Sequence, residues 1–102
     1  MTAMALLDKC RAAAGTREAA ALQAAATEVT LRLKGLERKV AREYYIRARS
    51  QRSIAVEMRY SYGYIRCILY YARKKLDEVP QTVVDDALSA AQKARKTKKS
   101  GV

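Results

Sequence analysis

The chain has 102 residues, half of them hydrophobic, and its 21 Lys and Arg residues outnumber 10 Asp and Glu residues, which gives a formal charge of +11 without any histidine. This length fits one small domain, and the apolar fraction excludes wholesale disorder. No apolar run reaches the roughly 18 residues that a membrane span needs. Asp8, Lys9 and Arg11 interrupt the apolar stretch near the N-terminus, so we expect neither a membrane anchor nor a signal peptide.

The residue types that catalysis and metal binding require are missing or scattered. Without histidine the commonest general base is absent, and the four glycines are too dispersed to form a phosphate-binding loop. The carboxylates lack metal-ligand spacing. Cys10 and Cys67 lie far apart, as expected for reduced thiols in the cytoplasm rather than for a zinc site or a disulfide framework. We therefore expect no enzyme, no cofactor and no metal. The positive charge predicts a polyanionic partner, nucleic acid before an anionic membrane.

Helix-forming residues dominate the whole chain, with Pro80 as the single proline and no period-two alternation, so the predicted fold class is all-α. The first helix is predicted over residues 3–14, with Thr2 as its N-cap and Gly15 at its end. Thr16 is predicted to cap the second helix.

An apolar series with alternating steps of four and three residues begins in this second helix. It consists of Leu22, Ala26, Val29, Leu33, Leu36 and Val40. Such a heptad-like seam is compatible with a homodimer through residues 16–40. It is equally compatible with a helical hairpin, in which the first helix folds back through Met4, Leu7 and Cys10. Gly35 weakens the seam, because glycine costs about 1 kcal/mol relative to alanine inside a helix. Residues 1–35 are thus predicted to be a helical extension, as a hairpin or a coiled coil.

Three more helices are predicted in the central segment, residues 36–78. The first runs from the residue after Gly35 to about Arg49, with an apolar face of Leu36, Val40, Tyr44 and Ala48. Ser50 and Gln51 are predicted to connect it to a short helix over residues 52–58. A turn at residues 59–61 then leads into a long helix over residues 61–76, capped by Ser61. Its inward positions are Ile65, Ile68, Leu69, Ala72 and Leu76.

The last segment, residues 79–102, is predicted to form a short helix and a basic tail. Thr82 is the expected cap of this helix, after a turn at residues 77–80. One side of the helix carries Val83, Val84, Ala87, Leu88 and Ala91. Residues 93–102 are predicted to fray and to touch phosphate without sequence preference.

Charge and aromatic residues are concentrated in the centre of the chain. Residues 36–76 hold eleven basic and three acidic side chains, a net charge of +8. They also hold all seven tyrosines: Tyr44, Tyr45, Tyr60, Tyr62, Tyr64, Tyr70 and Tyr71. Seven tyrosines are too many for one small helical unit to bury, since each buried hydroxyl needs a hydrogen-bond partner. Exposed tyrosines beside arginines suit contacts with phosphates and bases.

The short helix, three-residue turn and long helix follow the order of a helix-turn-helix, with the small Ala55 where the two helices cross. The stretch YIRARSQRSIAVEMRYSYGYIRCILYYARKKL, residues 45–76, resembles region 4 of bacterial primary sigma factors. Its frame "IA..M.YS.GYIR.I...A..KL" is similar to the ArpU/RinA-type phage transcription regulators. The resemblance covers about a third of the chain. It implies a DNA-binding regulator from a phage or prophage that acts on a late promoter in the bacterial host cytoplasm.

One residue departs from the pattern. Arg59 stands at a turn position where glycine is common, because φ there is often positive. An arginine in that conformation would carry a strain of about 1 kcal/mol.

Under this interpretation, the helix over residues 61–76 enters the major groove of double-stranded DNA. The residues predicted to contact bases are Tyr62, Gly63, Arg66 and Tyr70. The residues predicted to contact phosphates are Arg49, Arg52, Arg59, Ser61, Tyr64, Arg73 and Lys74. Arg66 is the candidate for a bidentate contact with guanine. Two alternatives remain open: a protein-interaction module that acts on the host RNA polymerase, and a small terminase or other packaging subunit.

Overall fold

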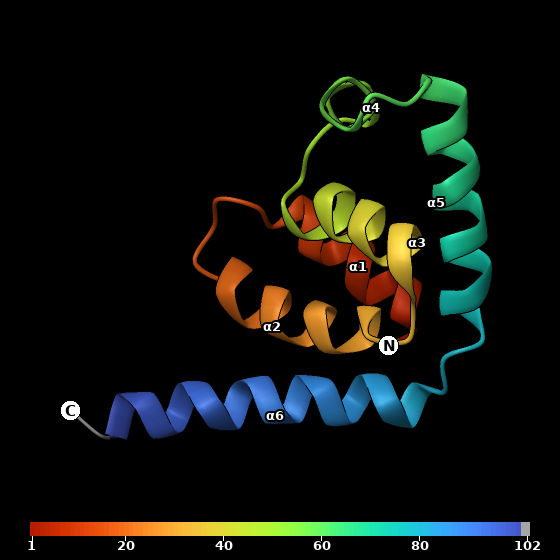
Figure 1. Ribbon diagram of the computed structural model, residues 1–102. Coiled ribbons are helices and arrows are strands. Elements are labelled where there is room, and N and C mark those ends of the chain that lie inside the picture. Colours follow the sequence, from red (N-terminus) through yellow and green to blue (C-terminus); the bar gives the residue numbers. More distant parts are fainter. Residues whose placement is uncertain (101–102) are drawn as a thin grey trace.

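The computed structural model is built from helices alone in the part of the chain that it describes, residues 1–100, with side chains described up to Lys93 (Figure 1). This confirms the predicted all-α class. In chain order the elements are α1 (Ala3–Ala12), α2 (Ala19–Thr30), α3 (Gly35–Ala41), the π-helical segment η1 (Arg42–Ile46), α4 (Gln51–Met58), α5 (Tyr62–Asp77) and α6 (Gln81–Ser100). None of the described helices is both long enough and apolar enough to cross a membrane.

Hydroxyl side chains cap three of the helices. Thr2 Oγ1 accepts a hydrogen bond from the Ala5 amide at 3.1 Å, and Ser61 Oγ accepts one from the Tyr64 amide at 3.1 Å, which confirms both predicted caps. Ser50 plays the same part for α4, since its Oγ accepts from the Ser53 amide at 3.1 Å. The predicted connector at Ser50 and Gln51 was therefore wrong: Ser50 is the cap and Gln51 is the first residue of the helix.

Two other predicted caps were also wrong. Thr16 lies three residues before α2, and its hydroxyl donates backward to the Ala13 carbonyl at 2.6 Å. Thr82 lies inside α6, which begins at Gln81 directly after Pro80. Gly15 does end the α1 region, with φ at +83°.

The apolar seam of residues 22–40 does not form a continuous helix. α2 ends at Thr30, and α3 starts at Gly35 with φ at +54° and runs in a new direction (Figure 1). Leu22, Val29 and Val40 are buried within the chain's own core. Because α1 and α6 both pack on α2, they cover the seam that a second chain would need. The intramolecular hairpin is therefore the alternative that the fold adopts, and a homodimer through residues 16–40 stays a prediction.

The helix predicted after Gly35 and up to about Arg49 starts one residue earlier, at Gly35, and ends early. Its α-helical part stops at Ala41, and the π-helical η1 follows to Ile46. A π-helical turn contains more residues than an α-helical one, so the next residue buried after Val40 and Ala41 is Tyr45, whereas the predicted Tyr44 is only half-buried. Ala48, predicted on the apolar face, has φ at +56° and lies outside any helix.

The C-terminal helix is longer than predicted. α6 spans 20 residues and continues through residues 93–100, where a frayed tail was expected. Val84 and Ala87 are buried and anchor its first half against α2. The tail was predicted to touch phosphate. Its side chains after Lys93, and residues 101–102 as a whole, lie outside the described residues.

A single core joins all these elements. It includes residues of the N-terminal hairpin, such as Leu6 and Leu7, together with Ile54 of α4, Ile65 of α5 and Val84 of α6. Both cysteines are free: Cys10 lies in this core, where burial raises the pKa of its thiol, and Cys67 is exposed on α5. The segments predicted as extension and central unit therefore share one hydrophobic interior.

Candidate nucleic-acid interface

The turn between α4 and α5 is tight and closes with a left-handed residue. Arg59 has φ at +61° and ψ at +39°, the conformation for which glycine is preferred. The Tyr60 amide donates to the Ala55 carbonyl at 3.0 Å, so the last turn of α4 remains hydrogen-bonded as the chain reverses. The departure noted at Arg59 is therefore real: an arginine occupies a strained position and projects an exposed side chain at the tip of the turn.

Apolar contacts fix α4 against α5. Ile54 and Ala55 are buried on α4, and Ile65 is fully buried on α5. The small side chain of Ala55 lets the two helices come close. Further along α5, Leu69, Ala72 and Leu76 bury the same side of the helix against the rest of the core. The opposite side of α5 is consequently turned to solvent along its length.

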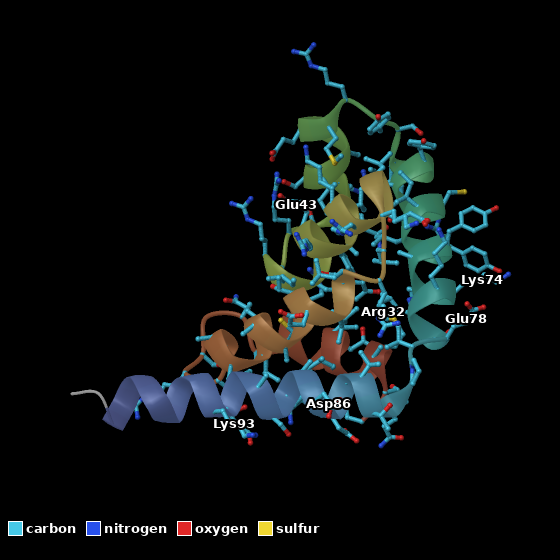
Figure 2. The ribbon with its side chains drawn as sticks, turned by 60° about the horizontal axis from the view of Figure 1, so that its bottom comes forward. Arg32, Glu43, Lys74, Glu78, Asp86 and Lys93 are labelled. Atoms are coloured by element: carbon cyan, nitrogen blue, oxygen red, sulfur yellow. The ribbon has the colours of Figure 1, made fainter. Side chains whose placement is uncertain are left out.

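The solvent-facing side of α5 carries the residues predicted to contact bases. Tyr62, Gly63, Arg66 and Tyr70 are all exposed, as are Arg73 and Lys74 one to two turns further on. Lys74 projects away from the other helices in Figure 2. A Cβ atom built on Gly63 would meet no atom within 4 Å, so nothing inside the protein requires a glycine at this exposed position.

Cations and tyrosine rings are paired across this surface. The guanidinium carbon of Arg52, on α4, lies 5.1 Å from the centroid of the Tyr62 ring, and that of Arg66 lies 5.8 Å from the same centroid. Lys74 Nζ lies 5.2 Å from the centroid of Tyr70. These distances are within the range of cation–π attraction. The surface is therefore both positively charged and aromatic.

A hollow separates the start of α4 from the middle of α5. It is lined by Gln51, Arg66, Leu69, Tyr70, Arg73, Lys74 and Asp77. The Gln51 side-chain oxygen is buried at this place and has no hydrogen-bond partner among the described residues. The sequence did not indicate Gln51 as a site residue, because the predicted connector included it. The hydroxyl of Ser50 before a helical run was the signal that could have placed it in α4.

Two of the residues predicted to contact phosphate make contacts with neighbouring residues of the protein. Ser61 Oγ serves as the cap of α5. Tyr64 lies beside Tyr60, with ring centroids 4.9 Å apart, and both rings remain partly exposed. Arg52, Arg59, Arg73 and Lys74 are the predicted phosphate contacts that remain exposed and form no ion pair within residues 1–93.

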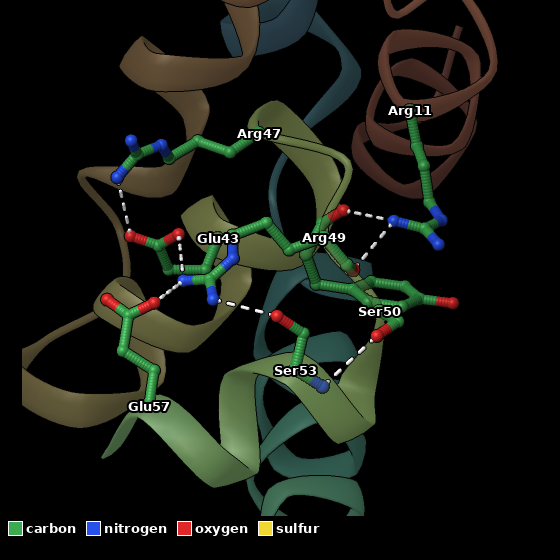
Figure 3. A network of polar contacts seen from close by, with 8 residues as sticks. Arg11, Glu43, Arg47, Arg49, Ser50, Ser53 and Glu57 are labelled. Atoms are coloured by element: carbon green, nitrogen blue, oxygen red, sulfur yellow. Dashed lines mark hydrogen bonds and ion pairs between the residues drawn. The ribbon is translucent and has the colours of Figure 1, made fainter.

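Arg49, another predicted phosphate contact, forms ion pairs within the protein. Its Nη1 pairs with Glu43 at 3.3 Å and also with Glu57, and its Nη2 donates to Ser53 Oγ at 2.8 Å (Figure 3). Arg49 therefore ties η1 to α4, and its charge is already paired with carboxylates within the protein. Nothing in its sequence neighbourhood distinguishes it from Arg52, because its partners come together only in the folded chain.

No family model, curated protein or solved structure matches this chain. The resemblance to sigma region 4 and to the ArpU/RinA-type regulators therefore stays a prediction.

Proposed function

We propose that this protein is a sequence-specific transcription regulator that binds double-stranded DNA, with α5 in the major groove and α4 across the backbone. The observation that carries the proposal is the distribution of unpaired charge. Arg52, Arg59, Arg66, Arg73 and Lys74 form no ion pair in the described chain. Of the basic residues in 36–76, those that do pair are Arg47, Arg49 and Lys75.

The dimensions of α5 suit this role. Its 16 residues span about 24 Å, and the major groove of B-DNA, about 12 Å wide, admits an α-helix. Gly63 in the first turn allows close approach to the groove floor, and the N-terminal end of the helix carries a partial positive charge. In a helix-turn-helix the N-terminal residues of the second helix contact base edges, and Gly63 and Arg66 occupy this part of α5.

Selection of bound duplexes from a random DNA pool tests the proposal. We expect a shared motif among the selected duplexes. Affinity should fall steeply with salt: four phosphate contacts predict a slope of log K against log salt of about −3.6. Duplexes without a common motif, or affinity that is insensitive to salt, would contradict the proposal. The sequence resemblance adds that the regulator is of phage or prophage origin, which a selected motif found upstream of phage late genes would support.

A second candidate function, contact with a protein such as the host RNA polymerase, is favoured by one observation. Val56 on α4 is 79% exposed, more than any other large hydrophobic residue whose side chain is described, and DNA binding gives it no role. An apolar protein contact should persist at salt concentrations that abolish DNA binding. Pull-down of purified polymerase by the wild-type chain but not by Val56→Ser at high salt would support this candidate.

A further inference from the structure

We infer that Tyr62 is a positioning residue, whose ring holds the guanidinium groups of Arg52 and Arg66 in place for DNA: Arg66 for a guanine and Arg52 for a neighbouring phosphate. This inference rests on the proposed DNA-binding function and deepens it. The sequence predicted that Tyr62 itself contacts a base. The structure instead places two cations on its ring.

The ring lies where α4 and α5 meet and receives one cation from each helix. Tyr62 is the first residue of α5, and Arg66 follows one turn later on the same helix. Arg52 comes from the second position of α4. The two guanidinium carbons lie 5.1 and 5.8 Å from the ring centroid, while Tyr62 as a residue stays 42% exposed. The cluster is thus at the surface and open to a ligand.

Electrostatics explain why the cluster needs both a ring and an external anion. Two guanidinium groups near one point repel each other, and the negative face of an aromatic ring offsets part of that repulsion. Within residues 1–93 neither arginine forms an ion pair with a carboxylate, so the charge remains available to a ligand. DNA supplies two suitable acceptors side by side: a backbone phosphate, and the O6 and N7 atoms of guanine.

A ring that restrains Arg66 before binding reduces the side-chain entropy lost on binding. It also restricts the directions from which the guanidinium can approach a base, so the ring should affect the choice of base more than the overall affinity. The aromatic face is the active feature in this role, and the hydroxyl is dispensable. Phenylalanine at position 62 should therefore keep the positioning role of the ring, whereas leucine, which has no aromatic face, should lose it.

The experiment measures dissociation constants of the full-length chain for the selected duplex and for duplexes in which each guanine is replaced in turn. Tyr62→Phe should keep the wild-type preference for one guanine, and Tyr62→Leu should reduce that preference roughly two- to five-fold. Tyr60→Leu is the matched control, because Tyr60 is also 42% exposed but no cation lies over its ring in the described residues. In an Arg66→Ala background, Tyr62→Leu should change the preference no further.

Three results would overturn the inference. If Tyr62→Leu keeps the full guanine preference, the ring does not position Arg66, although the DNA-binding function stands. If Tyr62→Phe loses as much preference as Tyr62→Leu, the hydroxyl contacts DNA directly and the ring is not the active feature. If the wild-type chain has no preference among duplexes, the proposed function and the inference both fail. Circular dichroism of each variant shows that its helices are retained.

Discussion

Arg11 of α1 donates a hydrogen bond from Nη1 to the main-chain carbonyl oxygen of Arg49, 38 residues further along the chain, at 3.0 Å. The same nitrogen donates to the Tyr44 carbonyl at 2.6 Å, and the guanidinium lies 4.0 Å from the centroid of the Tyr44 ring. The N-terminal helix thereby supports the irregular segment that leads into α4. The segment before the central unit is thus part of the platform on which the candidate interface stands.

Replacement of Arg11 by alanine should destabilise the fold by about 1.5–3 kcal/mol, because hydrogen bonds from a charged group are lost and two carbonyls are left without their donor. Urea denaturation followed by circular dichroism measures the change. Arg17→Ala is the control, since Arg17 is exposed in the loop between α1 and α2 and should change stability little. Equal stability of Arg11→Ala and wild type would mean that the contact is not important for the fold.

Gly63→Ala separates stability from binding. Alanine should stabilise α5 by up to about 1 kcal/mol, because glycine is unfavourable inside a helix and an added Cβ meets no atom within 4 Å. The same methyl group should weaken DNA binding if α5 lies in the groove. Thermal denaturation and DNA titration of one preparation test both statements. A variant that is more stable and binds as tightly as wild type would place Gly63 away from the DNA.

Arg66 and Arg73 are predicted to differ in the kind of contact that they make. Arg66→Ala should relax the choice of base at one position, since a bidentate contact with guanine discriminates by about 1–3 kcal/mol. Arg73→Ala should weaken binding evenly across sequences and reduce the salt slope by about one. Parallel selections with the two variants compare the motifs. Unchanged affinity in both variants would exclude α5 from the groove.

Replacement of Arg59 should affect two quantities separately: stability through the backbone conformation, and DNA affinity through the lost charge. Arg59→Gly relieves a left-handed conformation and should stabilise the protein by about 1 kcal/mol. Arg59→Ala keeps the strained conformation and should bring no such gain. Both variants lose the same charge, so both should show the same weaker DNA affinity and a smaller salt slope. A difference in affinity between them would indicate that the shape of the turn, rather than its charge, matters for binding.

The buried phenol of Tyr45 should make the protein less stable at alkaline pH. Tyr45 is the buried residue of η1, and burial raises the pKa of Tyr45 to about 12 from 10, with the nearby charge of Arg73 acting in the opposite direction. Because the folded state disfavours the phenolate, the unfolded chain releases its proton first. The stabilisation is complete below pH 10 and is lost as the pH rises toward 12. Tyr45→Phe should lose less stability than wild type between pH 10 and 12, as urea denaturation at each pH would show.

Local signals in the sequence were sufficient for α5 and its turn. Ser61 caps the helix where predicted, the five inward residues of α5 are buried, and Arg59 adopts the left-handed conformation that its position implied. These features depend on residues within one or two turns of each other, so the order of residue types determines them. The surface that carries Tyr62, Arg66 and Tyr70 follows directly, because it is the opposite side of the same helix.

Contacts between residues that are distant in the sequence could not be predicted from these local signals. The seam of residues 22–40 was compatible with a second chain or with the chain's own helices, and the choice depended on how α1 and α6 pack on α2. Arg49 and Arg52 look alike in sequence, yet one is held by Glu43 and Glu57 while the other lies over Tyr62.

Composition and periodicity by themselves determined an all-helical chain whose charge and tyrosines are concentrated on one helical unit, since both properties depend on residue types and their spacing. Only the tertiary structure decided which cations remain available to a ligand. An ion pair requires two charges within a few ångströms of each other, and the fold, through the π-helical turn and the reversal at residues 31–34, determines which carboxylates reach which arginines.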